Sequence, residues 1–190
     1  MLPRRWAGFA QKAIHAVKDA DPNTRCGVAL SDYERDNYLT PFLELNGLDL
    51  LGLNVFTLRG LPTFTRMAQA AQARGKAVYI AQTWRPTYLG AQTPGRQSLE
   101  KDVSGGVGNA EFTDIDIKWL AAMTRYASTL GLEAVSPLWT QTFFLYVNGP
   151  PDGGLDPGYN KQVSAAVPSG ATTLTYAAFQ RLSASFGATP

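Results

Sequence analysis

Residues Lys76–Thr83, with the sequence KAVYIAQT, decide the fold class. The apolar residues of this stretch form a continuous run and do not alternate with polar ones. Such runs are typical of parallel strands that are covered on both faces. We therefore predict a buried parallel strand here, preceded by an amphipathic helix over Leu61–Ala73 that Arg74 and Gly75 close as a C-cap.

Similar patterns recur along the rest of the chain. Three further apolar runs predict strands: Arg25–Leu30, Leu48–Phe56 and Leu132–Trp139, the last extended by Thr142–Tyr146. Helical spacing or polarity predicts helices between and around them: Trp6–Val17, Asp32–Leu45, Thr113–Leu130 and Thr173–Phe186. The order is a helix followed by four strand–helix units, which predicts an α/β fold with a parallel sheet of four strands.

Four strands cannot close a (β/α)8 barrel, which usually takes about 250 residues. The chain of 190 residues therefore fits either half of such a barrel or an open, doubly wound sheet. The open sheet should carry a phosphate-binding loop, but no Gly-x-Gly-x-x-Gly follows the first predicted strand and no Walker motif is present. Residues 105–108 (GGVG) lie in a long segment, Arg85–Asn109, and indicate a loop rather than a nucleotide cradle.

Composition excludes several classes of protein. The mass of 20.6 kDa suits one core, so we expect a single domain over residues 1–190. With 17 basic and 15 acidic residues and no basic block, nucleic-acid and membrane-surface binding are disfavoured. Cys26 and His15 are the single cysteine and histidine, which excludes an internal disulfide, a cysteine or histidine metal cluster and most Ser-His-Asp schemes. We expect no metal and no cofactor.

The first residues give no targeting signal. Met1–Trp6 is positively charged, but no apolar run of signal-peptide length follows it. No stretch approaches the roughly 18 consecutive apolar residues of a membrane-spanning helix. We expect a soluble protein, or one that is exported with a leader absent from this sequence, and the compartment stays undefined.

Taken together, the motifs are similar to a known family. Lys76–Trp84 resembles the seventh strand of the clan A glycoside hydrolases, the cellulase and endo-galactanase-like (β/α)8 barrels. Asp21–Val28 resembles the entry to the fifth strand, Leu48–Phe56 the sixth and Glu133–Trp139 the eighth. The resemblance covers most of Trp6–Trp139 in the right order. It implies that the chain is the C-terminal half of such a barrel, from the fourth helix onward, with strands five to eight.

The resemblance also implies roles for particular residues. Gln82 stands at the position of the nucleophilic glutamate, and Trp139 would floor the subsite next to the cleaved bond. Asn54 is the asparagine of the sixth-strand motif, for which the resemblance implies substrate binding. The strand with the general acid/base would precede Met1, and the amide of Gln82 cannot form the glycosyl ester that a carboxylate forms. The resemblance thus implies a protein related to enzymes that hydrolyse O-glycosidic bonds of β-linked polysaccharides, inactive or incomplete as this chain.

The acids near the strand ends do not form an opposed pair. Glycosidases need two carboxyl groups, and in this fold both sit at carboxyl ends of strands. Asp32 and Glu34 follow the first predicted strand, but the other predicted strand ends supply no acid before Asp152. For Asp32 and Glu34, a helix N-cap and first-turn charge is an equal alternative to catalysis.

Other residues suit carbohydrate binding. Trp84, Trp139 and Tyr88 could stack on pyranose rings or could pack in the core or at its rim. The Gln82 amide could bond a sugar hydroxyl or satisfy buried polar neighbours. Arg85 could orient a hydroxyl, or it could pair with Asp32.

Three functions and two partners therefore remain open. The chain could be glycosidase-like, a non-catalytic carbohydrate-binding domain, or an open α/β domain for another small metabolite. A four-stranded sheet has two bare edges, which favour pairing with another chain. We expect either a homodimer that approximates a full barrel or a missing N-terminal half-barrel.

Overall fold

A computed structural model of the chain describes residues 3–31, 36–84, 110, 113–138, 140–146 and 157–186. By its internal contacts the chain divides into two compact units. The first unit is Met1–Thr83 with Tyr126–Ser136, and the second is Trp84–Arg125 with Pro137–Pro190. This division is one of internal contacts, and the single domain expected over residues 1–190 stays a prediction.

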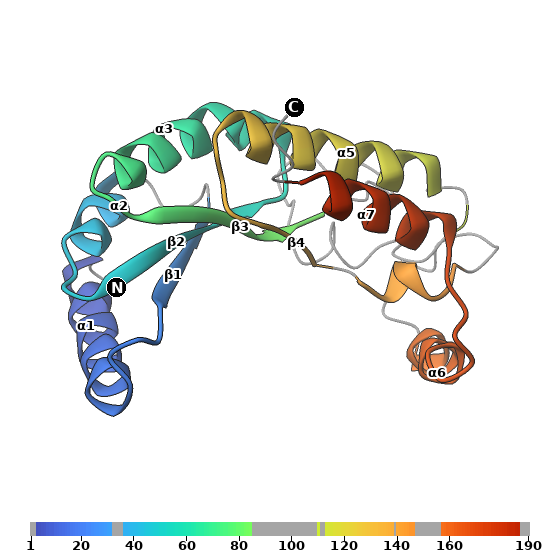
Figure 1. Ribbon diagram of the computed structural model, residues 1–190, viewed down its shortest axis with the longest axis horizontal. Helices are drawn as coiled ribbons and strands as arrows, with labels where there is room; N and C mark the ends of the chain where they lie inside the picture. The colour runs from blue at the N-terminus through green and yellow to red at the C-terminus, as the bar shows by residue number, and fades with distance from the viewer. Residues whose placement is uncertain are drawn as a thin grey trace, which may run out of the picture. The chain divides into compact units, whose positions relative to one another are not determined.

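The first unit is built on a sheet of four parallel strands with flanking helices, in the order β1-β2-β3-β4 (Figure 1). Its elements follow in chain order: α1 (Pro3–Ala20), β1 (Cys26–Ser31), α2 (Asp36–Leu43), β2 (Leu48–Val55), η1 (Leu58–Gly60), α3 (Leu61–Gln72), β3 (Ala77–Thr83) and most of β4 (Val135–Pro137). The predicted α/β half-barrel class, with its four strands in sequence order, is confirmed.

Most element boundaries lie within a few residues of the predicted ones. Gly75 follows α3 with a φ of 70°, a left-handed conformation that other residues rarely adopt, so the helix stops at the predicted glycine. Its C-cap residue is Ala73, one residue before the predicted pair Arg74 and Gly75. The fourth strand is shorter than predicted, since β4 spans only Val135–Pro137. Immediately before it, the Glu133 N–H donates to the Val78 carbonyl and the Ile80 N–H donates to that of Ala134, which aligns this segment with β3.

One face of the sheet is buried under α3. The fully buried side chains of Leu51, Leu53 and Val55 on β2 and of Val78 and Ile80 on β3 form this face. Helix α3 packs on both strands and contributes a stripe of buried side chains at helical spacing: Phe64, Met67, Ala68 and Ala71. This apolar layer fixes which side chains of β2 and β3 point to the opposite, more open face.

The second unit contains most of α5 (Thr113–Thr129), η3 (Thr140–Phe143), α6 (Pro157–Ala166) and α7 (Leu174–Ser185). Its core gathers Trp84, Leu120 and Phe143, with the Phe143 and Phe179 rings stacked at a centroid distance of 4.9 Å. Helix α6 has no counterpart among the predicted elements.

The predicted strand extension over Thr142–Tyr146 is wrong, because Thr142 and Phe143 are the last two residues of the 3-10 helix η3 and residues 144–146 form no strand. Thr173 fixes this conformation. Its hydroxyl donates to the Thr142 carbonyl over 2.6 Å, and its N–H donates to the Phe143 carbonyl over 2.9 Å. These carbonyls are therefore bonded to the residue that caps α7 and not to a strand.

The helices in the described part of the chain are too short or too polar to cross a lipid bilayer.

Candidate functional site

Three polar residues lie in one row at the carboxyl ends of β1, β2 and β3. Ser31 pairs with Asn54 across β1 and β2, and Asn54 pairs with Gln82 across β2 and β3. Residues that pair directly across neighbouring strands point to the same face of the sheet. The row therefore sets one hydroxyl and two amides side by side at the end of the sheet where parallel α/β folds build their sites.

A bulge in β3 brings Gln82 into this row. Leu53 pairs with Ile80, whereas the next residue of β2, Asn54, pairs with Gln82, so Ala81 is an extra residue on β3. Bulges of this kind re-aim the side chains that follow them and are common next to active sites. The bulge leaves Gln82 exposed, while the next residue, Thr83, is fully buried and donates to the Val55 carbonyl over 2.8 Å.

The Asn54 amide is the unusual member of the row. Its Oδ1 is buried and has no hydrogen-bond partner among the residues that the structure describes. A buried acceptor without a partner costs about 1–3 kcal/mol, so its retention in a folded protein calls for an explanation. The residue as a whole is only half-buried, and its neighbour Gln82 is exposed.

Small residues lie side by side on the open face of the sheet below the row. A Cβ added to Gly52 would lie 2.9 Å from the Ala81 Cβ and 3.1 Å from the Ala29 Cβ. It would also lie 3.1 Å from Cζ of Tyr79, so this ring covers the glycine on the open face. Because Gly52 lies two residues before Asn54 on β2, the row stands on the same face, opposite α3.

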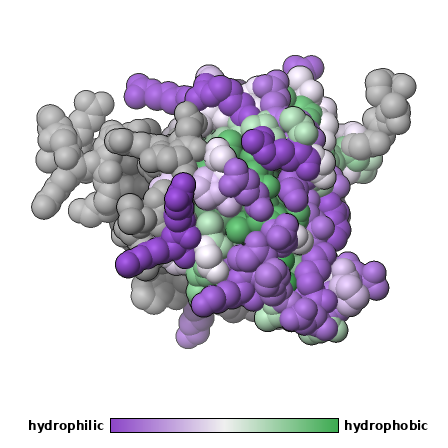
Figure 2. All heavy atoms as spheres, turned by 90° about the vertical axis from the view of Figure 1, so that its left-hand side faces the viewer, coloured by the Kyte–Doolittle hydropathy of each residue, from purple (hydrophilic) through white to green (hydrophobic). Residues whose placement is uncertain are grey.

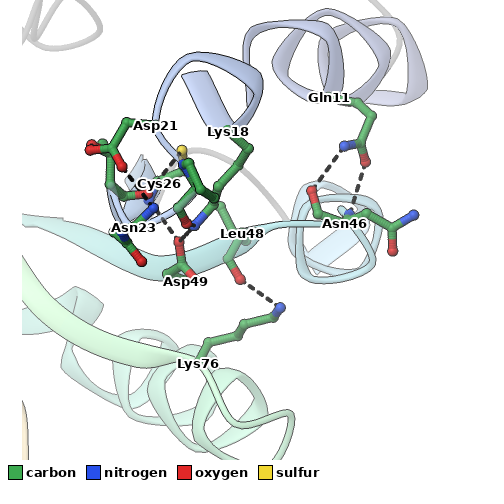
Figure 3. A network of polar contacts seen from close by, with 11 residues as sticks. Gln11, Lys18, Asp21, Asn23, Cys26, Asn46, Leu48, Asp49 and Lys76 are labelled. Atoms are coloured by element: carbon green, nitrogen blue, oxygen red, sulfur yellow. Dashed lines mark hydrogen bonds and ion pairs between the residues drawn. The ribbon is translucent and has the colours of Figure 1, made fainter. Parts of the chain in front are cut away.

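The charged network of the sheet lies at the other end of the strands (Figure 3). The Lys18 ammonium contacts Asp49 Oδ2 at 2.8 Å, and the Cys26 backbone N–H donates to the same oxygen over 2.9 Å. The Lys18 hydrogen bond and the Cys26 N–H lower the pKa of the Asp49 carboxyl. Since amino-terminal ends of strands serve stability in such folds, we interpret this network as structural.

The predicted site residues are thus only partly brought together. Gln82 and Asn54 are neighbours, as the row describes. Trp84 belongs to the second unit, where it is 2% exposed and packs with Leu120 and Phe143, which leaves its ring no free face for a sugar. Four further predicted residues lie outside the described part of the chain or its described side chains: Asp32, Arg85, Tyr88 and Trp139. Their roles stay predictions.

Comparisons with known proteins concern the fold. No protein-family model and no curated protein matches the chain. A glucosidase from Croceicoccus marinus matches with a TM-score of 0.55 at 15% identity, over 98% of this chain and 37% of that one. An endo-1,4-beta-mannanase from Rhizomucor miehei matches with a TM-score of 0.47 at 11% identity, over 86% of this chain and 45% of that one. The chain has a glycosidase-like fold.

The chain spans little more than a third of the glucosidase's length, so the likeness concerns part of that fold. At this identity it says nothing of activity. Membership of the clan A glycoside hydrolases stays a prediction from the motifs.

Sequence reasoning missed Ser31. Its place in the row depends on the pairing of β1 with β2, and the only sequence signal is that it directly follows the first apolar run. It also missed a polar cluster in the second unit. There the Tyr146 hydroxyl donates to Asp116 Oδ2 over 2.6 Å and lies 2.8 Å from the Thr175 hydroxyl. Burial and the Asp116 carboxylate raise the pKa of Tyr146, which keeps it a proton donor, and we interpret the cluster as structural.

Proposed function

We propose that the chain is part of a glycoside-hydrolase-type barrel that binds β-linked carbohydrate at the carboxyl ends of its strands without hydrolysing it. The observation that carries this proposal is the Asn54 oxygen, buried without a partner beside the exposed amide of Gln82. Amides both accept and donate hydrogen bonds, as sugar hydroxyls do. A sugar hydroxyl would bond to the exposed Gln82 amide, and a neighbouring one would satisfy the Asn54 oxygen once this half-buried side chain turns toward the sugar.

The same row argues against hydrolysis by this part of the chain. Paired-carboxylate glycosidases need one carboxyl group as acid and another as nucleophile or base. The described residues at the ends of β1, β2 and β3 are Ser31, Asn54 and Gln82, and none of them is an acid. The row can therefore orient a sugar by hydrogen bonds, but it supplies neither a proton nor a nucleophilic carboxylate.

Titration calorimetry with cellohexaose, a β-1,4-linked glucose hexamer, tests the proposal. We expect saturable binding by the wild-type chain. Asn54→Ala and Gln82→Ala should each weaken it by about 2- to 10-fold, because each removes a hydrogen bond worth about 0.5–1.5 kcal/mol. The matched control is Gln69→Ala, which removes an exposed amide from α3 and should leave affinity unchanged. Absence of binding at millimolar sugar, or equal affinity of all three variants, would reject the proposal.

A further inference from the structure

We propose that an apolar groove beside the edge strand β1 is a docking site for a second copy of this chain, whose β4 extends the sheet there. The groove has a volume of about 600 Å³ and lies within the first unit. Three elements line it, through residues that include Trp6, Phe9, Ala13, Ala29, Tyr38 and Phe42. This inference concerns assembly and does not depend on carbohydrate binding.

The rim of the groove carries large exposed apolar side chains. Trp6 and Phe9 on α1 are 46% and 66% exposed, and their rings meet edge to face at 6.1 Å. Figure 2, which views the side of the molecule where α1 and α2 lie, shows apolar side chains gathered between polar ones. A contiguous apolar patch with a polar rim is typical of a surface that another molecule covers.

The floor of the groove is the edge of the sheet. β1 stands at the end of the strand order and pairs with β2 on one side. The backbone groups along the outer side of an edge strand are a template for another strand. Gly27 and Ala29 on this strand are exposed and belong to the lining of the groove.

The packing of α3 indicates what belongs beside β1. Helix α3 lies between two parallel strands in the chain and packs on both β2 and β3. Helix α1 packs on β1 and α2, but it has no preceding strand on its other side among the described elements. By the same rule, the exposed half of α1 should cover a parallel strand on the outer side of β1.

The chain itself carries a strand that suits this place. The other end of the sheet is β4, and a two-fold axis along the strand direction would set β4 of one copy beside β1 of the other, in parallel. The reciprocal contact would form at the same time, so four strands from each copy would close a ring of eight, the number of a (β/α)8 barrel. A contact of β1 with β1 would instead be antiparallel and would leave β4 bare.

Light scattering after size-exclusion chromatography tests the assembly. We expect a mass of about 41 kDa, twice the 20.6 kDa of one chain. Phe9→Asp should raise the dimer dissociation constant about tenfold or more, because it places a charge in an apolar interface. Val17→Asp is the matched control, since Val17 is 39% exposed on the same helix but does not line the groove. A monomer at every concentration, or equal dimerisation of both variants, would overturn the proposal. The occupant of the groove would then be a strand that does not come from a second copy of this chain.

Cross-linking tests which strands meet. Ala29 on β1 and Ser136 on β4 are both exposed, and Cys26 is buried, so cysteines introduced at the two exposed positions can be targeted selectively. With a bismaleimide, a mixture of Ala29→Cys and Ser136→Cys chains should give a covalent dimer. Each variant alone and the wild type should remain single chains. A dimer from Ala29→Cys alone would show a β1–β1 contact and overturn the assignment of β4.

Discussion

Arg25 and Glu133 form a bidentate ion pair although they precede β1 and β4, the strands at opposite ends of the sheet. The two guanidinium nitrogens lie 2.9 and 3.1 Å from the two carboxylate oxygens. Three strand spacings separate β1 from β4, roughly 14 Å in a flat sheet, and two long side chains span this distance from either end. The pair therefore ties the amino ends of the edge strands across β2 and β3.

We expect this tie to contribute little to stability. Both side chains are about half exposed, and water screens such pairs. Arg25→Ala and Glu133→Ala should each lower the melting temperature slightly and by similar amounts. The double variant should be no less stable than the worse single one, because all three break the same pair. Additive losses of melting temperature in the double variant would contradict a pairwise origin. In 1 M salt the difference in melting temperature between the wild type and the single variants should disappear, because salt screens the pair.

The network around Asp49 predicts that the thermal stability of the protein depends on pH. Lys18 and the Cys26 N–H lower the pKa of Asp49 from its ordinary value of 3.8. A carboxyl whose pKa is depressed in the folded state stabilises the protein above its unfolded pKa and loses this contribution as pH falls through the folded pKa. The wild type should therefore melt above Asp49→Asn at pH 6, and the difference should shrink below about pH 4.

The control for this experiment is Asp19→Asn, a change at an exposed carboxyl on α1. Its melting temperature should track that of the wild type across the range. A constant gap between the wild type and Asp49→Asn from pH 6 to pH 3 would mean that Asp49 acts through shape and not through charge.

The close packing around Gly52 predicts that the centre of the sheet does not tolerate a side chain at this position. In Gly52→Ala the new Cβ would meet the Cβ atoms of Ala29 and Ala81, which belong to the strands on either side and cannot turn away. We expect a loss of about 1–3 kcal/mol in urea unfolding. Gly8→Ala is the matched control: nothing lies within 4 Å of a Cβ there, and alanine in helix α1 should add up to about 1 kcal/mol. Equal stability of Gly52→Ala and the wild type would refute the close approach.

The sequence predicts this fold well where the signal is local. The run KAVYIAQT and the helix Leu61–Ala73 carry their own periodicity and glycine stop, and the structure has both within one or two residues. The site depends on pairing between distant segments. Neither the bulge at Ala81, which aligns Gln82 with Asn54, nor the pairing that adds Ser31 leaves a pattern in one strand alone.

The burial of Trp84 is a second feature that the sequence alone does not predict. Its position at a strand end suggests a ring that is free to stack on a sugar. Whether such a ring faces solvent or core depends on residues far away in the sequence, and in the structure Leu120 and Phe143 enclose it. Burial of this kind is a property of the packed chain that position along a strand does not encode.

The buried Asp116 should make Tyr146 important for the second unit. Asp116 is 1% exposed and accepts a hydrogen bond from the Tyr146 hydroxyl. Tyr146→Phe removes that donor from a buried carboxylate and should cost about 1–3 kcal/mol. Tyr176→Phe is the comparison, because the Tyr176 ring packs on Phe143 and keeps those contacts without its hydroxyl. If both variants unfold at the same urea concentration, the hydroxyl of Tyr146 contributes nothing specific.

Gln82→Glu tests whether the strand ends retain a hidden catalytic site. The substitution places a carboxylate at an exposed position of the row. We expect binding of cellohexaose to persist and no hydrolysis in overnight chromatographic assays, because a glycosidase needs a second carboxyl group within about 5–9.5 Å. Asn54 and Ser31, the neighbours of Gln82 in the row, supply none. Gln82→Ala is the control for trace contaminating activity. Release of shorter sugars by Gln82→Glu, but not by Gln82→Ala or the wild type, would mean that another carboxyl group reaches the row and that one substitution separates this chain from an enzyme.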